Sequence, residues 1–491
     1  MTNLTHSVFK PLKIWKMKKY LFLLIVNLLW SINLVSAQKI TIQFDAEPTS
    51  TPSVSKAILK YNKDIAYSFT FDDASVDAFT CALPVFKGGY VSGNGQNYGG
   101  LFYTDGCGND IPFRGGTAWN SVNLGGIDVH SGNVAGQLTW QQLDTLYDFG
   151  WDVLNHSYSH RSYLNGPMSG NDYIDEIEKN RVFVKNKTQK HSEMPIFVVP
   201  SGDTFYNSIA YRQGNQLVFN QPGDVVGFGG LQINSDYNFD GKVIHRMLLE
   251  ESLAISPTFL DRAVAKTTTG DAKIWYNEFT HHIDDFSPNA SFGFKQFQAH
   301  LNRAAQMWGK NGTDKMWMAP LQEVYEYLMM RRFAQFTTSA NGTKVDLTFD
   351  LYNVPKWLRR RTLSLVVNST TNFSNVVVPS GISVTFKGVG NQKLINLDFT
   401  NFKTTAVSEE KIDPSVLKVY PNPTTQYLDV EWSNDNNLNS QLTVYDITGK
   451  AVLTTQTKEK KIRLNTAMLN SGQYFLSVKQ GELVYRGSFV K

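Results

Sequence analysis

The 491-residue chain has little of three features that would have pointed to particular protein classes. Its formal net charge is only +4, and no basic run is interleaved with aromatic residues, so nothing favours a nucleic-acid partner. It has only two cysteines, which allow at most one disulfide. After residue 37 no apolar stretch is long enough to cross a bilayer, so we expect no stable membrane span in the mature chain.

The N-terminus has the pattern of a targeting segment. Three lysines between residues 16 and 19 precede an apolar stretch at residues 20–30, and Val35-Ser36-Ala37 fits a small-residue cleavage site. Polar residues interrupt the apolar stretch, which favours a cleaved signal peptide (residues 1–37) over a membrane anchor. Export would permit a disulfide between Cys81 and Cys107, which is the expectation, and two buried free thiols are the alternative.

Two short polar segments follow strand-like apolar runs. Thr70-Phe71-Asp72-Asp73 ends the run at residues 65–71, and His156-Ser157-Tyr158-Ser159-His160 follows the run at residues 151–154. Together they offer one carboxylate and two imidazoles as ligands, as a catalytic zinc with an open position requires, and a second carboxylate as a base. An N-cap pair of carboxylates and two surface histidines are the alternative for each segment alone. Their joint occurrence favours the metal site.

The two segments together resemble the motifs of the NodB-type polysaccharide deacetylases, carbohydrate esterase family 4. That family has T-F-D-D as its first motif and H-S/T-x-x-H as its second, and this chain matches both. The resemblance implies that Asp72 is the catalytic base and that Asp73, His156 and His160 bind a divalent transition metal, Zn²⁺ or a substitute such as Co²⁺. It also implies a distorted (β/α) barrel that removes acetyl groups from a polysaccharide.

The later motifs of the family fit less completely. Residues 198–203 lack the arginine that the third motif places before a proline, and the fourth motif is not recognisable. The fifth motif ends a late strand with a histidine that acts as general acid. Here residues 273–280 run into His281 and His282, so the resemblance implies His281 as the acid, with His282 as the alternative. His130 is expected to be an ordinary hydrogen-bonded residue.

Strand-like and helix-like runs alternate from residue 65 to residue 332, which predicts an α/β fold with a parallel barrel or layered sheet. In such a barrel the reactive groups lie where strands end. Residues 88–136, rich in Gly, Asn and Asp, are predicted to form a long ordered loop or lid. Further strands are expected at residues 195–199, 225–228 and 315–318, and helices at residues 138–147, 173–184, 292–308 and 321–332.

The C-terminal third has a different pattern. Short alternating runs at residues 333–402 predict a small β-sandwich accessory domain after the barrel of residues 38–332. A Thr/Ser/Glu/Lys-rich linker follows at residues 403–414. Residues 415–491, with Tyr420-Pro421-Asn422-Pro423 near their start, resemble the C-terminal sorting domain of the type IX secretion system. That resemblance implies a second, Ig-like sandwich and export to the cell surface or the medium by that machinery.

The sequence therefore predicts an exported metal-dependent deacetylase that acts on N- or O-linked acetyl groups of a polysaccharide. Two alternatives stay open. The chain could be a non-catalytic carbohydrate-binding surface protein on a degenerate barrel, which the missing arginine would suit. It could also hydrolyse a non-acetyl amide in the same fold.

Overall fold

The structure is a computed structural model, and its description covers the chain from residue 38 to residue 491 apart from several short gaps. The residues left out are 1–37, 133, 189, 191–192, 214–216, 222–229, 235–236, 238, 240–242, 269–272, 288–289, 403–410, 413–416, 433–438, 447–450 and 481–482. The predicted signal peptide and the expected strand at residues 225–228 lie outside the described residues. Two compact units are distinguished, residues 1–403 and residues 404–491.

The first unit is built on a ten-stranded sheet with the order β12-β15-β3-β8-β9-β10-β11-β13, to which β14 is added beside β15 and β16 beside β3. Its pairings are parallel except the one between β12 and β15. In chain order the strands are β3 (Ile65–Phe71), β8 (Gly116–Trp119), β9 (Asp152–Asn155), β10 (Ile196–Val198), β11 (Leu217–Asn220), β12 (Leu231–Ile233), β13 (Val243–His245), β14 (Met247–Leu248), β15 (Lys273–Thr280) and β16 (Met316–Met318).

One short segment brings the two sides of this sheet together. Strand β13 pairs with β11, whereas β14, only one residue further on, pairs with β15. The residue between them is Arg246, which therefore lies where the sheet curls towards closure. The predicted α/β alternation is confirmed, and the sheet is the nearly closed, distorted barrel that was expected.

Helices cover the barrel, and local sequence explains where several of them begin. Thr139 and Gln142 form a capping box at the start of α3, and Ser169 and Asp172 form one at the start of α4. Leu321 opens α9 directly after Pro320, at a point where proline costs no helical hydrogen bond. The helices are α2 (Leu83–Lys87), α3 (Trp140–Asp148), α4 (Gly170–Lys187), α5 (Phe205–Arg212), α6 (Leu249–Leu253), α7 (Phe259–Thr268), α8 (Phe294–Trp308) and α9 (Leu321–Phe333).

The Gly-rich insertion differs from the long loop that was predicted. Residues 88–136 include the barrel strand β8, which pairs with both β3 and β9. They also form two hairpins, β4 (Gly89–Val91) with β5 (Gln96–Tyr98) and β6 (Phe102–Thr104) with β7 (Asp110–Pro112). The prediction missed β8 because Gly116-Thr117-Ala118-Trp119 has no apolar alternation; all four residues are nevertheless buried between neighbouring strands.

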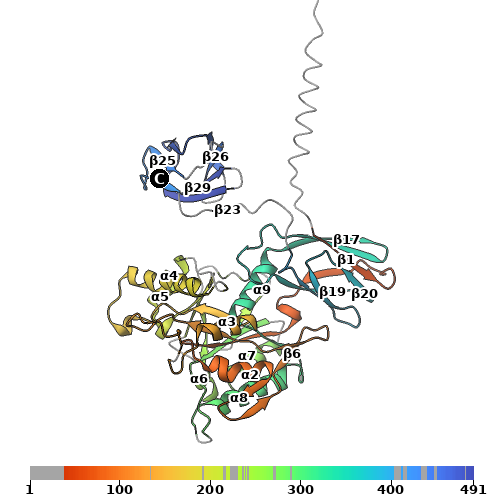
Figure 1. The fold of residues 1–491 in the computed structure, drawn as a ribbon. Helices are drawn as coiled ribbons and strands as arrows, with labels where there is room; N and C mark the ends of the chain where they lie inside the picture. Colours follow the sequence, from red (N-terminus) through yellow and green to blue (C-terminus); the bar gives the residue numbers. More distant parts are fainter. Residues whose placement is uncertain are drawn as a thin grey trace, which may run out of the picture. The chain divides into compact units, whose positions relative to one another are not determined.

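Two four-stranded antiparallel sheets follow the barrel in the chain, but their first strands come from its beginning. Strand β1 (Gln38–Phe44) pairs with β18 and β20, and β2 (Ser53–Lys56) pairs with β19. Figure 1 shows β1 among strands that lie more than 290 residues later in the sequence. The later strands are β17 (Gln335–Asn341), β18 (Lys344–Asp350), β19 (Thr362–Asn368), β20 (Phe373–Val377), β21 (Ser383–Lys387) and β22 (Lys393–Asp398).

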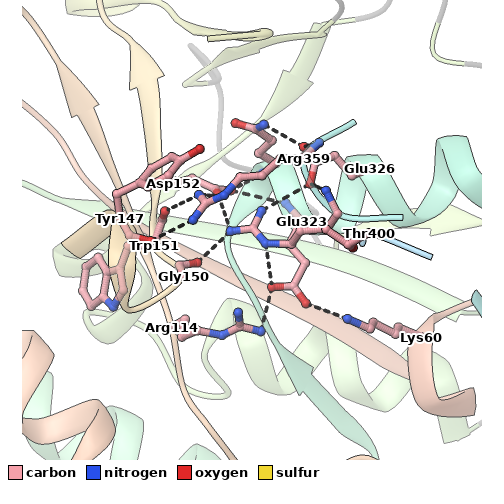
Figure 2. Close-up of polar contacts among 12 residues, drawn as sticks. Lys60, Arg114, Tyr147, Gly150, Trp151, Asp152, Glu323, Glu326, Arg359 and Thr400 are labelled. Atoms are coloured by element: carbon pink, nitrogen blue, oxygen red, sulfur yellow. Dashed lines mark hydrogen bonds and ion pairs between the residues drawn. The ribbon is translucent and has the colours of Figure 1, made fainter. Parts of the chain in front are cut away.

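A buried charge network, which we call the base network, joins this β-rich region to the barrel (Figure 2). Arg360 lies 3.0 Å from Asp152 and 3.3 Å from Glu326. Glu323, at the start of α9, is 3.0 Å from Lys60 and 2.7 Å from Arg114. Arg359 also donates to two backbone carbonyls of the barrel, those of residues 147 and 151. The segment after β18 is thus held to the N-terminal end of β9 by paired charges.

The second unit is all-β in its described part and has a hydrophobic core of its own. Its sheets are β23-β30-β29-β26-β27 and β24-β25-β28. The bounds are β23 (Lys411–Ile412), β24 (Lys418–Tyr420), β25 (Tyr427–Glu431), β26 (Ser440–Tyr445), β27 (Ala451–Thr457), β28 (Lys461–Asn465), β29 (Gln473–Gln480) and β30 (Leu483–Val490).

The fold also bears on two other predictions, the disulfide and the absence of a membrane span. The prediction of a disulfide is wrong, because Cys81 and Cys107 are both free thiols. Cys81 is buried in the barrel core, and Cys107 accepts a hydrogen bond from Asn396. Among the residues that the structure covers, no helix combines the length and apolar character that a membrane crossing requires.

Candidate metal centre and active site

The three predicted ligands meet at the C-terminal ends of barrel strands. Asp73 comes two residues after β3, and His156 directly follows β9, whose neighbour β8 separates it from β3. The backbone turns sharply here, with a φ of 59° at both Asp73 and His160. Non-glycine residues in this left-handed region are uncommon and concentrate at functional sites. The turns direct the side chains back across the ends of the strands.

The ligand atoms converge on one oxygen. His156 Nε2 lies 3.4 Å and His160 Nε2 3.2 Å from Asp73 Oδ1. One ligand atom from each of the three residues can be chosen so that all lie within 4.8 Å of one another. Asp73 Oδ1 is buried and accepts no hydrogen bond from any described residue. A carboxylate oxygen and two imidazole nitrogens that face one another in this way fit a divalent transition metal.

The residues around His156 orient its ring and fix which ring nitrogen is free to bind a metal. Its Nδ1 lies 2.8 Å from the carbonyl oxygen of Val198, to which it donates, so Nε2 keeps its lone pair for a metal. Burial, together with the neighbouring His156, lowers the pKa of His160 to about 4. Burial would raise the pKa of Asp73, but the adjacent side chain of His156 and the charges of both histidines hold it well below its usual range. The carboxylate is therefore ionised, as metal binding requires.

Asp72 lies beside this group and is held by an arginine that the sequence did not reveal. Arg246 donates from Nη1 to Asp72 Oδ1 and from Nη2 to Asp72 Oδ2, each over 2.7 Å. Both residues are almost fully buried, and the guanidinium also lies 4.2 Å from the ring centroid of Phe279. Burial alone would raise the pKa of Asp72, but Arg246 lowers it, so the carboxylate stays ionised.

The two candidate acids after β15 have different surroundings. His281 is half-buried, its ring lies 5.8 Å from the ring of Phe279 that Arg246 covers, and its charge is among those that lower the pKa of Asp72 and of Asp73. His282 is exposed and turns to other partners: its Nδ1 is 3.3 Å from Ser75 Oγ and 3.7 Å from Asp77 Oδ2. The geometry therefore favours the assignment of His281 over that of His282.

Comparisons with known proteins agree with this geometry. Residues 35–220 match the family model for polysaccharide deacetylase, and residues 418–491 match the secretion system C-terminal sorting domain. This chain carries a polysaccharide deacetylase domain of the NodB type. It also carries the sorting domain that directs export through the type IX secretion system, to the cell surface or the environment. A comparison with curated proteins gives no match.

Similar solved structures include carbohydrate esterases and a deacetylase. The Xyl-CE4 domain of a multidomain xylanase from the hindgut metagenome of Trinervitermes trinervoides is 16% identical, with 53% of this chain and 89% of that one covered and a TM-score of 0.28. A family 4 carbohydrate esterase from Streptomyces lividans, solved with acetate, is 12% identical, with coverage of 52% and 91% and a TM-score of 0.28. The Streptococcus pyogenes deacetylase PplD, also with acetate, is 16% identical; the match covers 31% of this chain and only 55% of that one, with a TM-score of 0.23.

The deacetylase domain obtains two polar residues of its site from a segment that the sequence motifs did not single out. Arg246 precedes β14, and Glu250 lies in the first turn of α6. Thr280 donates to Glu250 Oε1 over 3.1 Å; burial raises the pKa of Glu250, and His281 is among the charges that oppose the rise. A signal was present, because Val243-Ile244-His245 is an apolar-rich run followed directly by a charged residue, as at Asp72 and His156.

Proposed function

We propose that this chain is an exported, metal-dependent deacetylase that hydrolyses acetyl groups of a polysaccharide. The observation that carries the proposal is the convergence of two parts, a set of candidate ligands and a candidate base, whose residues lie within the matched family region. Asp73, His156 and His160 face one another, and Asp72 lies beside them in a bidentate pair with Arg246. A barrel that only bound sugar would gain nothing from a buried, ionised carboxylate held beside three ligands. That argues against the non-catalytic alternative.

The three ligands would hold a divalent transition metal, with zinc as the first candidate and cobalt as a substitute. When bound, the metal supplies a Lewis acid that polarises the acetyl carbonyl and lowers the pKa of water. The residues supply the rest. Asp72, kept ionised and oriented by Arg246, takes the proton from the attacking water. His281 donates a proton to the departing amine or alkoxide of the sugar, since of the two histidines after β15 it is the one whose charge acts on Asp72 and Asp73.

The remaining regions take supporting roles in this proposal. We infer that residues 1–37 are a cleaved signal peptide and that residues 415–491 engage the secretion machinery after the linker at residues 403–414. The sheets of residues 333–402 form a β-sandwich that is completed by β1 and β2 and packs on the barrel. The sorting domain forms the second sandwich. Neither sandwich has a part in the chemistry.

The test is acetate release from a panel of N- and O-acetylated polysaccharides, measured together with metal content. We expect release by the wild type, and we expect Asp73→Ala to lose most of its bound metal and its activity, because one of three protein ligands is gone. His282→Ala is the matched control: it changes a neighbouring histidine outside the ligand set and should keep metal and turnover. Full metal occupancy in Asp73→Ala would refute the assignment of the ligands. A wild type that releases acetate from no glycan would refute the function.

A further inference from the structure

The deacetylase site opens into a pocket that extends well beyond its metal ligands. The pocket has a volume of about 480 Å³. Asp73 and His160 form one part of its wall, and uncharged residues form the rest: Asn120, Asn123, Leu124, Gly125, Gln137 and Ser159. Most of these lie in two segments, one directly after β8 and one just before α3. A substrate that reaches the metal ligands through this pocket lies against these two segments.

Two amide side chains in this wall have an unused hydrogen-bond acceptor. Asn120 is 8% exposed, and its Nδ2 donates to the carbonyl oxygen of Val122, which sets the orientation of its amide. Its Oδ1 is buried and accepts no hydrogen bond from any residue that the structure describes. The same holds for Gln137 Oε1 on the other segment. A buried acceptor without a donor costs about 1–3 kcal/mol. Both residues would therefore gain from a donor brought by a ligand.

The backbone holds both segments firmly beside the catalytic residues. Gln137 forms a bridge with Ser75, and hydrogen bonds of 2.9 Å from Val76 to Gly136 and from Leu138 to Ala74 flank it. His130 joins the two segments, with Nε2 2.6 Å from the Asn120 carbonyl oxygen and Nδ1 2.7 Å from that of Leu138. The two amides are thus attached to the turn that carries Asp73. The terminal torsions of Asn and Gln side chains are broad, so a ligand that brings a donor can select an amide rotation that turns the oxygen towards it.

We propose that Asn120 and Gln137 form a sugar subsite of the deacetylase, in which each amide oxygen accepts a hydrogen bond from a hydroxyl group of a neutral glycan. The proposal rests on the proposed function and adds the class of substrate. Sugar hydroxyls donate, whereas carboxylate and phosphate groups do not. Among the described residues that line the pocket there is also no lysine or arginine to bind an anionic sugar. Leu124, 61% exposed beside the two amides, gives the apolar C–H face of a sugar ring a surface to lie on.

The kinetic test compares Asn120→Ala, Gln137→Ala and the wild type on two kinds of substrate. One is an acetylated neutral tetrasaccharide, given as N-acetylated chitotetraose and as O-acetylated xylotetraose; the other is 4-nitrophenyl acetate, which has no sugar. We expect each variant to lower kcat/KM for the tetrasaccharide about 5- to 10-fold, mainly through KM, and to leave 4-nitrophenyl acetate turnover unchanged. Gln137→Glu, which keeps an acceptor, should retain most of the glycan activity. Asn97→Ala, an exposed asparagine on β5, is the matched control.

A binding measurement decides the subsite independently of turnover. The two tetrasaccharides are titrated calorimetrically into Asp72→Asn protein with and without Asn120→Ala or Gln137→Ala. Weaker binding by the variants supports the subsite even if no acetate is ever released, which would refute only the proposed function. Equal affinities, or equal losses on the glycan and on 4-nitrophenyl acetate, would overturn the subsite and leave the amides with a structural role alone.

Discussion

The two ends of β9 hold buried charges in opposite ways. At its N-terminal end Asp152 belongs to the base network, where Arg360 lies 3.0 Å away and the nearby Glu323 is paired with Lys60 and Arg114 (Figure 2). At its C-terminal end His156 faces Asp73, whose Oδ1 accepts no hydrogen bond from any described residue. At the N-terminal end of the strand the buried charges are paired with oppositely charged side chains. At the C-terminal end the ligand atoms face one another and are available to bind a metal.

This difference follows the division of labour in parallel barrels, in which the C-terminal ends of strands carry chemistry and the opposite ends carry stability. The base network joins β9, α9 and the segment at Arg359 and Arg360, so it fixes the β-rich region to the barrel. Asp72 combines features of both ends of the strand. Arg246 neutralises it as thoroughly as the base network neutralises its carboxylates, yet Asp72 lies among residues that could bind a metal.

The largest expected effect comes from Asp72→Asn. This change keeps the shape of the side chain and removes the base, so we expect kcat to fall about 10²–10⁴-fold while the metal stays bound. Acetate release and elemental analysis on the same preparation give both readouts. Unchanged turnover would mean that the two ends of the barrel do not differ in chemistry as described.

Arg246→Gln is the companion variant. It removes the partner that orients Asp72, and the expected loss is about 10²-fold in kcat, since a misplaced catalytic group costs roughly that much. Arg246→Lys, which keeps the charge but not the bidentate geometry, should fall between wild type and Arg246→Gln. Metal loss in Arg246→Gln would contradict the role as an orienting residue and give it a role in holding the ligand turn.

Arg360→Met should act on stability and not on turnover. It leaves buried carboxylates without their cation, which costs about 3–5 kcal/mol in the free energy of unfolding. Urea unfolding measures the loss, and kcat at 25 °C should be unchanged. Arg361→Met is the matched control, because this neighbouring arginine makes no ion pair among the described residues; it should change stability by less than about 0.5 kcal/mol. A similar loss from both variants would remove the special role of the base network.

A smaller effect on the free energy of unfolding is expected when the pH is lowered. Burial would raise the pKa of Glu323, but Arg114, Lys60 and Arg360 hold it well below its usual range. A carboxyl group with a depressed folded pKa contributes stability that is complete above its unfolded pKa of about 4.3 and is lost as the pH falls towards the folded value. The wild type should therefore lose stability below about pH 4. Glu323→Gln should begin less stable and lose less over the same range; parallel curves would contradict this.

The smallest effect on catalysis is expected from removing residues 404–491. The second unit has its own hydrophobic core, so the purified first unit should keep its kcat and its midpoint of unfolding. Export is the property that should fail, since the sorting domain is gone. Cell fractionation with acetate assays separates the two readouts. A folded but inactive first unit would show that the sorting domain contributes to the site.

Local patterns were enough to predict the strands at residues 65–71 and 273–280, and two short motifs after β3 and β9 were enough to name the candidate ligands. The prediction failed where pairing overrides local preference. Strand β8 has no apolar alternation, and its four residues form a strand because β3 and β9 lie on either side. Likewise, Cys81 and Cys107 could have formed a disulfide by sequence, but each has other neighbours in the folded chain.

The sequence by itself identified the two candidate ligand motifs and the sorting domain, because each motif depends on residues that are close together in the chain. Only the tertiary structure decided which residue orients Asp72, since Arg246 lies 174 positions away and reaches it where β13 and β14 bring two sides of the sheet together. It also decided that β1 and β2 complete sheets formed by residues 335–398. Side chains far apart in sequence meet only when strand pairing places them, and no local pattern records that pairing.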